Sequence, residues 1–197
     1  MIPVALLWLG TEPSSAACGQ IDPLGLLPED AACDGWLRDG TPRTADSFQE
    51  LAQIIDGAAG LHDQYGFVSA AIQNYAGDRS ERGGSQAPSA PVVAATLALF
   101  NQGTSENASL LYGDPASGMG EPIAGWGCAG EARFRVAAGS TVVQFREECF
   151  FGSITVLSGE EAGVDGARCL AERACSLVRQ AVPVKKEGWG SLRALFR

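Results

Sequence analysis

The chain has 197 residues, 46% of them hydrophobic, and a formal net charge of -9 at pH 7. This length is enough to bury one core, and no shift in composition divides the chain, so we expect a single domain. The net negative charge argues against nucleic acid and against anionic lipid as general partners. No apolar run approaches the roughly 18 to 20 residues of a membrane-spanning helix, so we expect no transmembrane span.

Residues 1–17 have features of a secretory signal. An apolar run, residues 2–9, is followed by the small residues 15–17 immediately before Cys18, where a signal peptidase would cleave. The usual basic start is missing, and Ser15 stands where a lipoprotein signal has leucine. We expect an exported protein, periplasmic, outer-membrane-associated or extracellular, with membrane contact only if Cys18 is lipidated. The alternative is an apolar segment that packs on the domain, which Pro3 favours.

The cysteines fit an oxidising compartment better than the cytosol. No pair has C-x-x-C spacing and the chain has a single histidine, so we expect disulfides and no metal or cofactor site. Most pairings stay open. Cys169 with Cys175 is excluded, because six residues of helix separate their Cα atoms by about 9 Å, beyond the roughly 7 Å limit for a disulfide. The candidates are Cys18, Cys33, Cys128, Cys149, Cys169 and Cys175.

The first half of the chain predicts a lead-in followed by a long helix. Residues 18–43 place Pro, Gly and Asp at short intervals, so we expect no long element there. From Thr44 to Gly66, apolar residues recur every three or four positions, which indicates an amphipathic helix ended by a left-handed glycine. Gly57 and Gly60 interrupt this helix, and we expect them to allow close approach to a sheet. The alternative is a turn at Asp56 and Gly57 between two short helices.

The second half predicts strands joined by short connections. We expect strands at 67–75 and 91–100 around a polar loop, 77–91, then a short helix from Thr104 to Tyr112 and a loop, 116–130. An antiparallel meander and a C-terminal helix follow, at 131–136, 141–146, 151–157 and 158–182. The fold class is therefore α+β: an antiparallel sheet of about five strands with a long N-terminal helix, a short middle helix and a C-terminal helix, in a domain spanning 44–182.

Two segments carry a resemblance to a known family. IIDGAAGLHDQYGFVSAAIQNY and FNQGTSENASLLYGD, with the meander and the last helix, resemble a bacterial family known only as a domain of unknown function. Its members carry a helix-to-strand motif similar to NGAAELY followed by YGF. The resemblance covers residues 22–182. Gly60 departs from it, since an acidic residue is usual there, and the loop at 77–91 is enlarged. The resemblance implies an exported or envelope-associated protein and brings no known activity.

The acid–base candidates all have structural explanations. His62 is expected to be a partly exposed structural residue, and Asp63 points about 100 degrees away from it on a helix, so the two form no dyad. Glu147 and Glu148 lie at an expected hairpin turn. Glu160 and Glu161 lie in the first turn of the last helix, where negative charge is favoured. We therefore expect no catalytic residues.

Residues 125–130 match the glycine pattern G-x-G-x-x-G of dinucleotide-binding sites. That motif needs a strand before it and a helix after it, so that the helix N-terminus can hold a pyrophosphate. Here an alternating strand is expected to follow. We therefore interpret the glycines as a tight loop that lets Cys128 reach a partner sulfur.

The tail, residues 183–197, is basic and amphipathic in an acidic chain. We expect it either to dock on its own domain or to bind a partner groove or an anionic surface. The candidate contact residues are Trp189, Leu192, Arg193 and Phe196.

The leading hypothesis is an exported, disulfide-stabilised, non-catalytic binding or accessory domain of a bacterial envelope, whose partner is another protein or an apolar ligand. One alternative is a subunit of a larger assembly docked through the tail. The other is a hydrolase-type enzyme that uses His62 or carboxylates in a pocket between helix and sheet.

Overall fold

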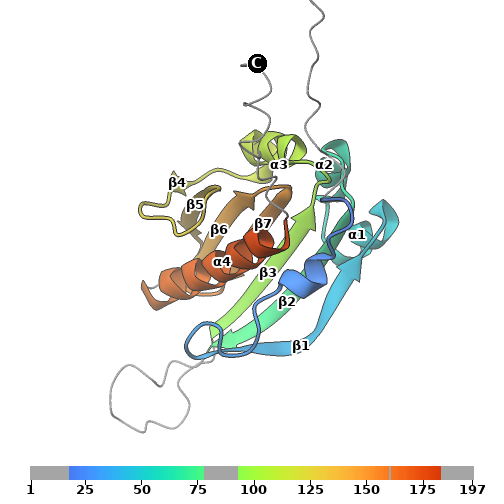
Figure 1. Ribbon diagram of the computed structural model, residues 1–197. Coiled ribbons are helices and arrows are strands. Elements are labelled where there is room, and N and C mark those ends of the chain that lie inside the picture. Colours follow the sequence, from blue (N-terminus) through green and yellow to red (C-terminus); the bar gives the residue numbers. More distant parts are fainter. Residues whose placement is uncertain (1–17, 78–92, 160, 183–197) are drawn as a thin grey trace, which may run out of the picture.

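The computed structural model describes residues 18–77, 93–159 and 161–182, which form an antiparallel sheet with helices on both faces (Figure 1). The strands are β1 (Trp36–Ala45), β2 (Ser69–Gly77), β3 (Val93–Asn101), β4 (Glu121–Pro122), β5 (Glu131–Ala137), β6 (Ser140–Glu147) and β7 (Phe150–Val156). The helical segments are η1 (Pro23–Leu26), α1 (Phe48–Ile54), α2 (Ala59–Gln64), α3 (Ser105–Gly113), η3 (Pro115–Ser117) and α4 (Glu161–Ala181).

The strand order is β1-β2-β3-β7-β6-β5-β4, so the sheet consists of two meanders that meet where β3 pairs with β7. At this seam Leu97 lies opposite Ile154. The chain leaves the central strand β3, passes through α3 and η3, and returns at the edge strand β4. The α+β class and the meander β5–β7 are as predicted. The described sheet has seven strands rather than about five, because neither β1 nor β4 has a clear strand pattern in the sequence.

Strand β1 occupies part of the segment in which we expected no long element. Its register with β2 shifts between Asp39 and Arg43, across a stretch that contains Gly40 and Pro42. Proline cannot donate to a strand ladder, but an edge strand with a bulge tolerates it. Gly and Pro therefore mark a bulge here rather than a loop, and the expectation of an irregular segment up to residue 43 is wrong.

The predicted long helix is also wrong, and the two-helix alternative is confirmed. Ala45 ends β1, and α1 then begins after Ser47, whose hydroxyl accepts a hydrogen bond from the Glu50 N–H at 3.3 Å. Ile55 is extended and Gly57 has φ 71°, which separates α1 from α2. A Cβ added at Gly57 or Gly60 would meet nothing within 4 Å. These glycines therefore do not face the sheet, in contrast to our expectation.

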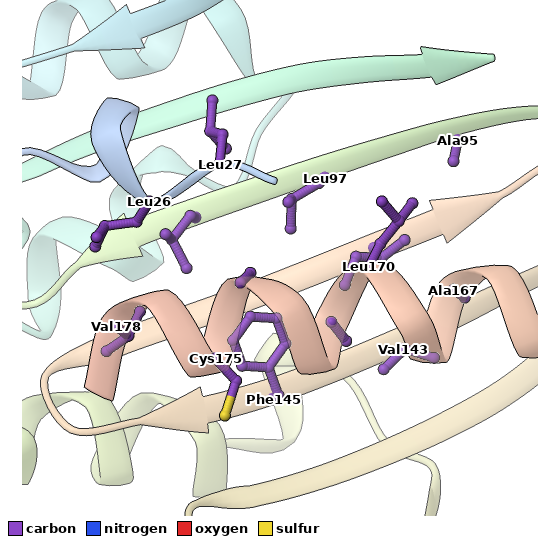
Figure 2. Close-up of a cluster of buried hydrophobic side chains, with 14 of the residues drawn as sticks. Leu26, Leu27, Ala95, Leu97, Val143, Phe145, Ala167, Leu170, Cys175 and Val178 are labelled. Carbon is purple, nitrogen blue, oxygen red and sulfur yellow. The ribbon is translucent and has the colours of Figure 1, made fainter. Parts of the chain in front are cut away.

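One face of the sheet carries the main core, under α4. Figure 2 shows Leu170, Cys175 and Val178 of α4 beside Val143 and Phe145 of β6. Leu170 and Ala174 lie four residues apart on one apolar stripe of α4, and they have no exposed surface. Other members of this cluster come from the N-terminal segment and from strands β3 and β7, and they include Leu26, Leu27, Leu97, Ile154 and Val156. The burial of this stripe holds α4 across β6 and β7.

Among the described residues, the helices on the opposite face cover one end of it (Figure 1). There α1, α2 and α3 bury a smaller cluster that contains Ala45, Leu51, Ala59, Ala70, Phe100, Leu111 and Phe151. Beyond it the strands carry small or polar side chains that are exposed or partly exposed. We call this surface the open sheet face, and it consists of Asn74, Ala94, Thr96, Ala98, Ser153 and Thr155.

Candidate functional site

Three disulfides link the described residues: Cys18–Cys149, Cys33–Cys169 and Cys128–Cys175. They close long stretches of chain, with sequence separations of 131, 136 and 47 residues. Two of them end on α4, at Cys169 and Cys175, and each joins the helix to a segment without regular structure. The expected disulfide bonds are therefore present, and the excluded pair is not formed.

A buried asparagine also ties the start of the described chain to the sheet. The side-chain N–H₂ of Asn101 donates to the carbonyl oxygens of Cys18 at 2.6 Å and of Ile21 at 3.1 Å. Its side-chain oxygen accepts from the Gly103 N–H at 2.9 Å. Satisfied polar groups of this kind specify one arrangement, because leaving any of them unpaired in the core would destabilise the fold.

His62 is buried rather than partly exposed. Only 5% of its surface is accessible, and its ring stacks on Phe100 with centroids 3.9 Å apart. With the amide oxygen of Gln102 facing the ring, His62 Nδ1–H donates to it at 3.0 Å, and the amide nitrogen donates to the Tyr65 carbonyl at 3.0 Å. Burial lowers the pKa of His62 to about 4, so the ring is neutral at pH 7. His62 is therefore a packed core residue. It lies on the same side of the sheet as the open sheet face, at the end that the helices cover.

Glu147 is the titratable residue that sequence reasoning undervalued. We placed it at a hairpin turn, yet its side chain is 1% exposed and lies beneath the Cys128–Cys175 disulfide. Its Oε2 accepts from the Gly130 N–H at 2.7 Å and lies 3.0 Å from the Cys175 sulfur. Burial raises the pKa of Glu147, and the Gly130 N–H and the Arg179 guanidinium oppose this shift. The only signal in the sequence was its position two residues before Cys149.

The loop before β5, residues 125–130, holds Cys128 over α4. Glu172 accepts a hydrogen bond from the Gly127 N–H at 3.1 Å, and Arg168 donates to the Gly125 carbonyl. A Cβ at Gly130 would lie 1.8 Å from the Arg146 carbonyl oxygen, so only glycine fits there. Strand β5 follows at once, which leaves the glycine pattern without the helix that a pyrophosphate site requires.

Cys128, Glu147 and Cys175 form a compact group whose ligand atoms lie within 4.8 Å of one another. Metal binding by cysteine requires thiolates, and these two sulfurs are joined to each other. In the disulfide form the group therefore does not offer a thiolate site. What the arrangement presents instead is a carboxyl group in hydrogen-bond contact with one sulfur of a disulfide.

Several predicted features lie outside the described residues. They are the signal-like segment 1–17, most of the loop 77–91, Glu160, and the tail candidates Trp189, Leu192, Arg193 and Phe196. None of the helices in the described ranges is long and apolar enough to cross a membrane. In the remaining carboxylate pairs, Glu148 is partly exposed and Glu161 is exposed in the first turn of α4, where negative charge complements the helix dipole.

Comparisons with known proteins give one similar structure. No protein-family model matches the chain, and no curated protein matches it. The chain is similar to the extracellular domain of PknH from Mycobacterium tuberculosis, with 9% sequence identity and a TM-score of 0.43. The match covers 78% of this chain and 93% of that structure.

Proposed function

We propose that the protein is an exported, disulfide-stabilised, non-catalytic binding or accessory domain of a bacterial cell envelope. The observation that carries this proposal is the set of three disulfides. Disulfides persist in oxidising compartments and are rare in the cytosol. The signal-like segment before Cys18 and the resemblance to an exported bacterial family support the same location.

The positions of the acid–base candidates argue against the base of a hydrolase. His62 is stacked on Phe100 and bonded to Gln102, so its ring is not presented to a substrate. The Glu147 carboxyl lies under a disulfide and a backbone N–H. A general base must come within hydrogen-bond reach of the proton that it removes, and neither group faces an accessible surface. Among the described residues, no observation therefore favours the hydrolase alternative.

The open sheet face is the surface that we assign to binding, with a second protein as the partner. Its side chains are small and uncharged, and Thr96 donates to Asn74 across two strands at 3.0 Å. Strand backbones fully paired in the sheet hold these side chains rigidly, which reduces the entropy lost on association. Arg133 and Arg146 stand on the neighbouring strands β5 and β6, at the side of this surface.

Site-specific photo-crosslinking tests this assignment. A photo-reactive residue is introduced at Thr96 on the open sheet face or, as the matched control, at Gln180 on the exposed side of α4, and envelope extracts are irradiated. We expect one discrete adduct from the Thr96 position that excess unlabelled protein competes away, and none from Gln180. Equal labelling at both positions, or no competition, would refute the binding surface. Accumulation of the full-length chain in the cytosol would refute export.

A further inference from the structure

We propose that the Cys128–Cys175 disulfide is a thiol-exchange site, at which a dithiol attacks the Cys128 sulfur and Glu147 gives its carboxyl proton to the departing Cys175 sulfur. The substrate class is a small dithiol or a protein dithiol. This inference is independent of the binding surface proposed above, and it concerns the opposite face of the sheet.

The contact between Glu147 and the disulfide defines the state of the carboxyl group. Oε2 lies 3.0 Å from the Cys175 sulfur. A sulfur in a disulfide carries no proton, so this contact is a hydrogen bond only when the carboxyl is protonated and donates. Burial raises the pKa of Glu147 and so favours that form. In the protonated form, the proton of Glu147 lies beside the sulfur that has to receive it.

The surrounding charges set the pH range over which the proton is held. The Arg179 guanidinium on α4 lies 3.9 Å from Glu147 Oε1. Arg146 on β6 also lowers the pKa of Glu147, whereas Glu148 in the turn raises it. Glu172 faces the same loop from α4 but is engaged by the Gly127 N–H and by Arg168. As pH rises past the pKa of Glu147, the group loses the proton, and exchange at Cys175 loses its donor.

The two sulfurs differ in access, which assigns their roles. Cys128 is partly exposed on its loop, whereas Cys175 has no exposed surface. An incoming thiolate reaches Cys128, forms a mixed disulfide with it, and displaces Cys175 as a thiolate. Glu147 protonates that thiolate and becomes a carboxylate. The second thiol of the dithiol then attacks the mixed disulfide, leaves oxidised, and releases Cys128, which takes a proton from solvent.

The reduced form has hydrogen-bond acceptors in place for both new thiols. The Cys175 thiol would donate to the Glu147 carboxylate, and the Cys128 sulfur lies 3.6 Å from the Glu172 carbonyl oxygen. The loop also stays attached to α4 by contacts other than the disulfide. These are the bonds from Arg168 to the Gly125 carbonyl and from Arg179 to the Gly127 carbonyl. When the disulfide opens, both thiols therefore have hydrogen-bond acceptors and the loop stays bonded to α4.

The Cys33–Cys169 disulfide is the matched comparison within the same molecule. It also joins a buried sulfur, Cys33, to a partly exposed one, Cys169, on α4. Among the described contacts, no carboxyl group is hydrogen-bonded to either of its sulfurs. We therefore expect a neighbouring acid to affect thiol exchange at Cys128–Cys175 and not at Cys33–Cys169.

The test follows the opening of both disulfides in the purified full chain. The protein is treated with dithiothreitol between pH 5 and 9, free thiols are alkylated at intervals, and peptides are mapped by mass spectrometry. The reductant's own ionisation affects both disulfides, so it cancels in the ratio of their rates. We expect Cys128–Cys175 to open at least about tenfold faster at the acidic end of this range, in keeping with acid catalysis, and the ratio of the two rates to fall as pH rises.

The variant Glu147→Gln keeps the size of the side chain but has no proton to give. We expect it to reduce the ratio by about tenfold and to remove its pH dependence, while the Cys33–Cys169 rate stays unchanged. If this variant does not fold, a small monothiol applied to the native protein decides the point: the mixed disulfide should form on Cys128. Equal opening rates of the two disulfides, an unchanged ratio in Glu147→Gln, or a mixed disulfide on Cys175 would overturn the proposal.

Discussion

The two faces of the sheet differ in their packing: one carries the larger buried cluster, and the other carries an open surface. Under α4, a continuous apolar cluster is joined to the helix by the disulfides at Cys169 and Cys175. On the opposite face, a smaller cluster packs at one end, and the rest of the surface is open. We expect the face with the larger buried cluster and the two disulfides to carry most of the stability. The other face can then keep small, accessible side chains that contribute little to stability.

Each face also buries one titratable group, and burial shifts the pKa of that group. Glu147 lies on the α4 side with a raised pKa, and His62 lies on the opposite side with its pKa lowered to about 4. Burial disfavours the charged form in both cases, and the opposite directions follow because one group is an acid and the other a base. The acid is placed against a disulfide, whereas the base is stacked on an aromatic ring.

The largest expected effect is the loss of a disulfide on the α4 side. Replacing both Cys33 and Cys169 by alanine opens a 136-residue separation, which in the chain-entropy model lowers the free energy of unfolding by about 5 kcal/mol. The Cys128/Cys175 double alanine variant, with a separation of 47, should lose about 4 kcal/mol. Urea denaturation without reductant measures both. Loss of less than about 1 kcal/mol from either would contradict the idea that this side holds the fold.

A pair of leucine substitutions compares a buried side chain of α4 with an exposed side chain of α3 without changing the cysteines. Leu170→Ala on α4 removes a side chain with no exposed surface and should cost about 2 to 5 kcal/mol. Leu110→Ala on α3 removes one that is 53% exposed and should change the free energy of unfolding by less than about 0.5 kcal/mol. Thermal or urea unfolding of the two variants gives the comparison. Similar losses would show that burial does not set the contribution of these two side chains to stability.

The buried histidine predicts a pH dependence. The pKa of His62 falls from 6.5 to about 4 on folding, so the unfolded chain binds a proton that the folded chain does not as pH drops below 6.5. Stability should therefore be constant above neutral pH and fall by about 2 kcal/mol between pH 7 and 5. The variant His62→Gln should lack this component of the slope. Parallel pH profiles for the native chain and the variant would mean that His62 does not titrate as a buried base.

The smallest effect is expected at the exposed glycine of α2. Gly60→Ala adds a Cβ that meets nothing within 4 Å, so it should stabilise the helix by up to about 1 kcal/mol. Gly57→Ala is its control, because φ 71° at Gly57 is unfavourable for alanine. Differential scanning calorimetry should show a small rise in melting temperature for the first and a fall for the second. A fall for Gly60→Ala would restore the expectation that this glycine packs closely against a neighbour.

Local patterns predicted the second half of the chain well. Helix α3 begins after Thr104, whose hydroxyl accepts from the Asn107 N–H at 3.0 Å, and the meander follows the expected hairpins. The prediction of one long helix was wrong because the apolar residues keep their three- to four-residue spacing across the turn at Asp56 and Gly57. The spacing alone therefore does not show that the helix ends there. Strand β1 was not predicted because glycine and proline indicate a loop as strongly as they indicate a bulge in an edge strand.

The sequence predicted individual residues of the candidate site but not how they come together. The sequence identified Cys128 on a tight glycine loop and Cys175 on the last helix. It did not predict their pairing, because disulfide partners depend on long-range packing. Nor did it predict the burial of Glu147: a hairpin carboxylate is normally solvated, and this one is covered only because the loop before β5 crosses it through Gly130.

Mass spectrometry of the native protein, with and without reduction, tests the central claim most directly. We predict a mature chain that lacks its first residues and gains six mass units on reduction of its three disulfides. Peptide mapping should then show Cys18–Cys149, Cys33–Cys169 and Cys128–Cys175. A chain that retains Met1 and carries six free thiols would contradict the account of an exported, disulfide-stabilised domain.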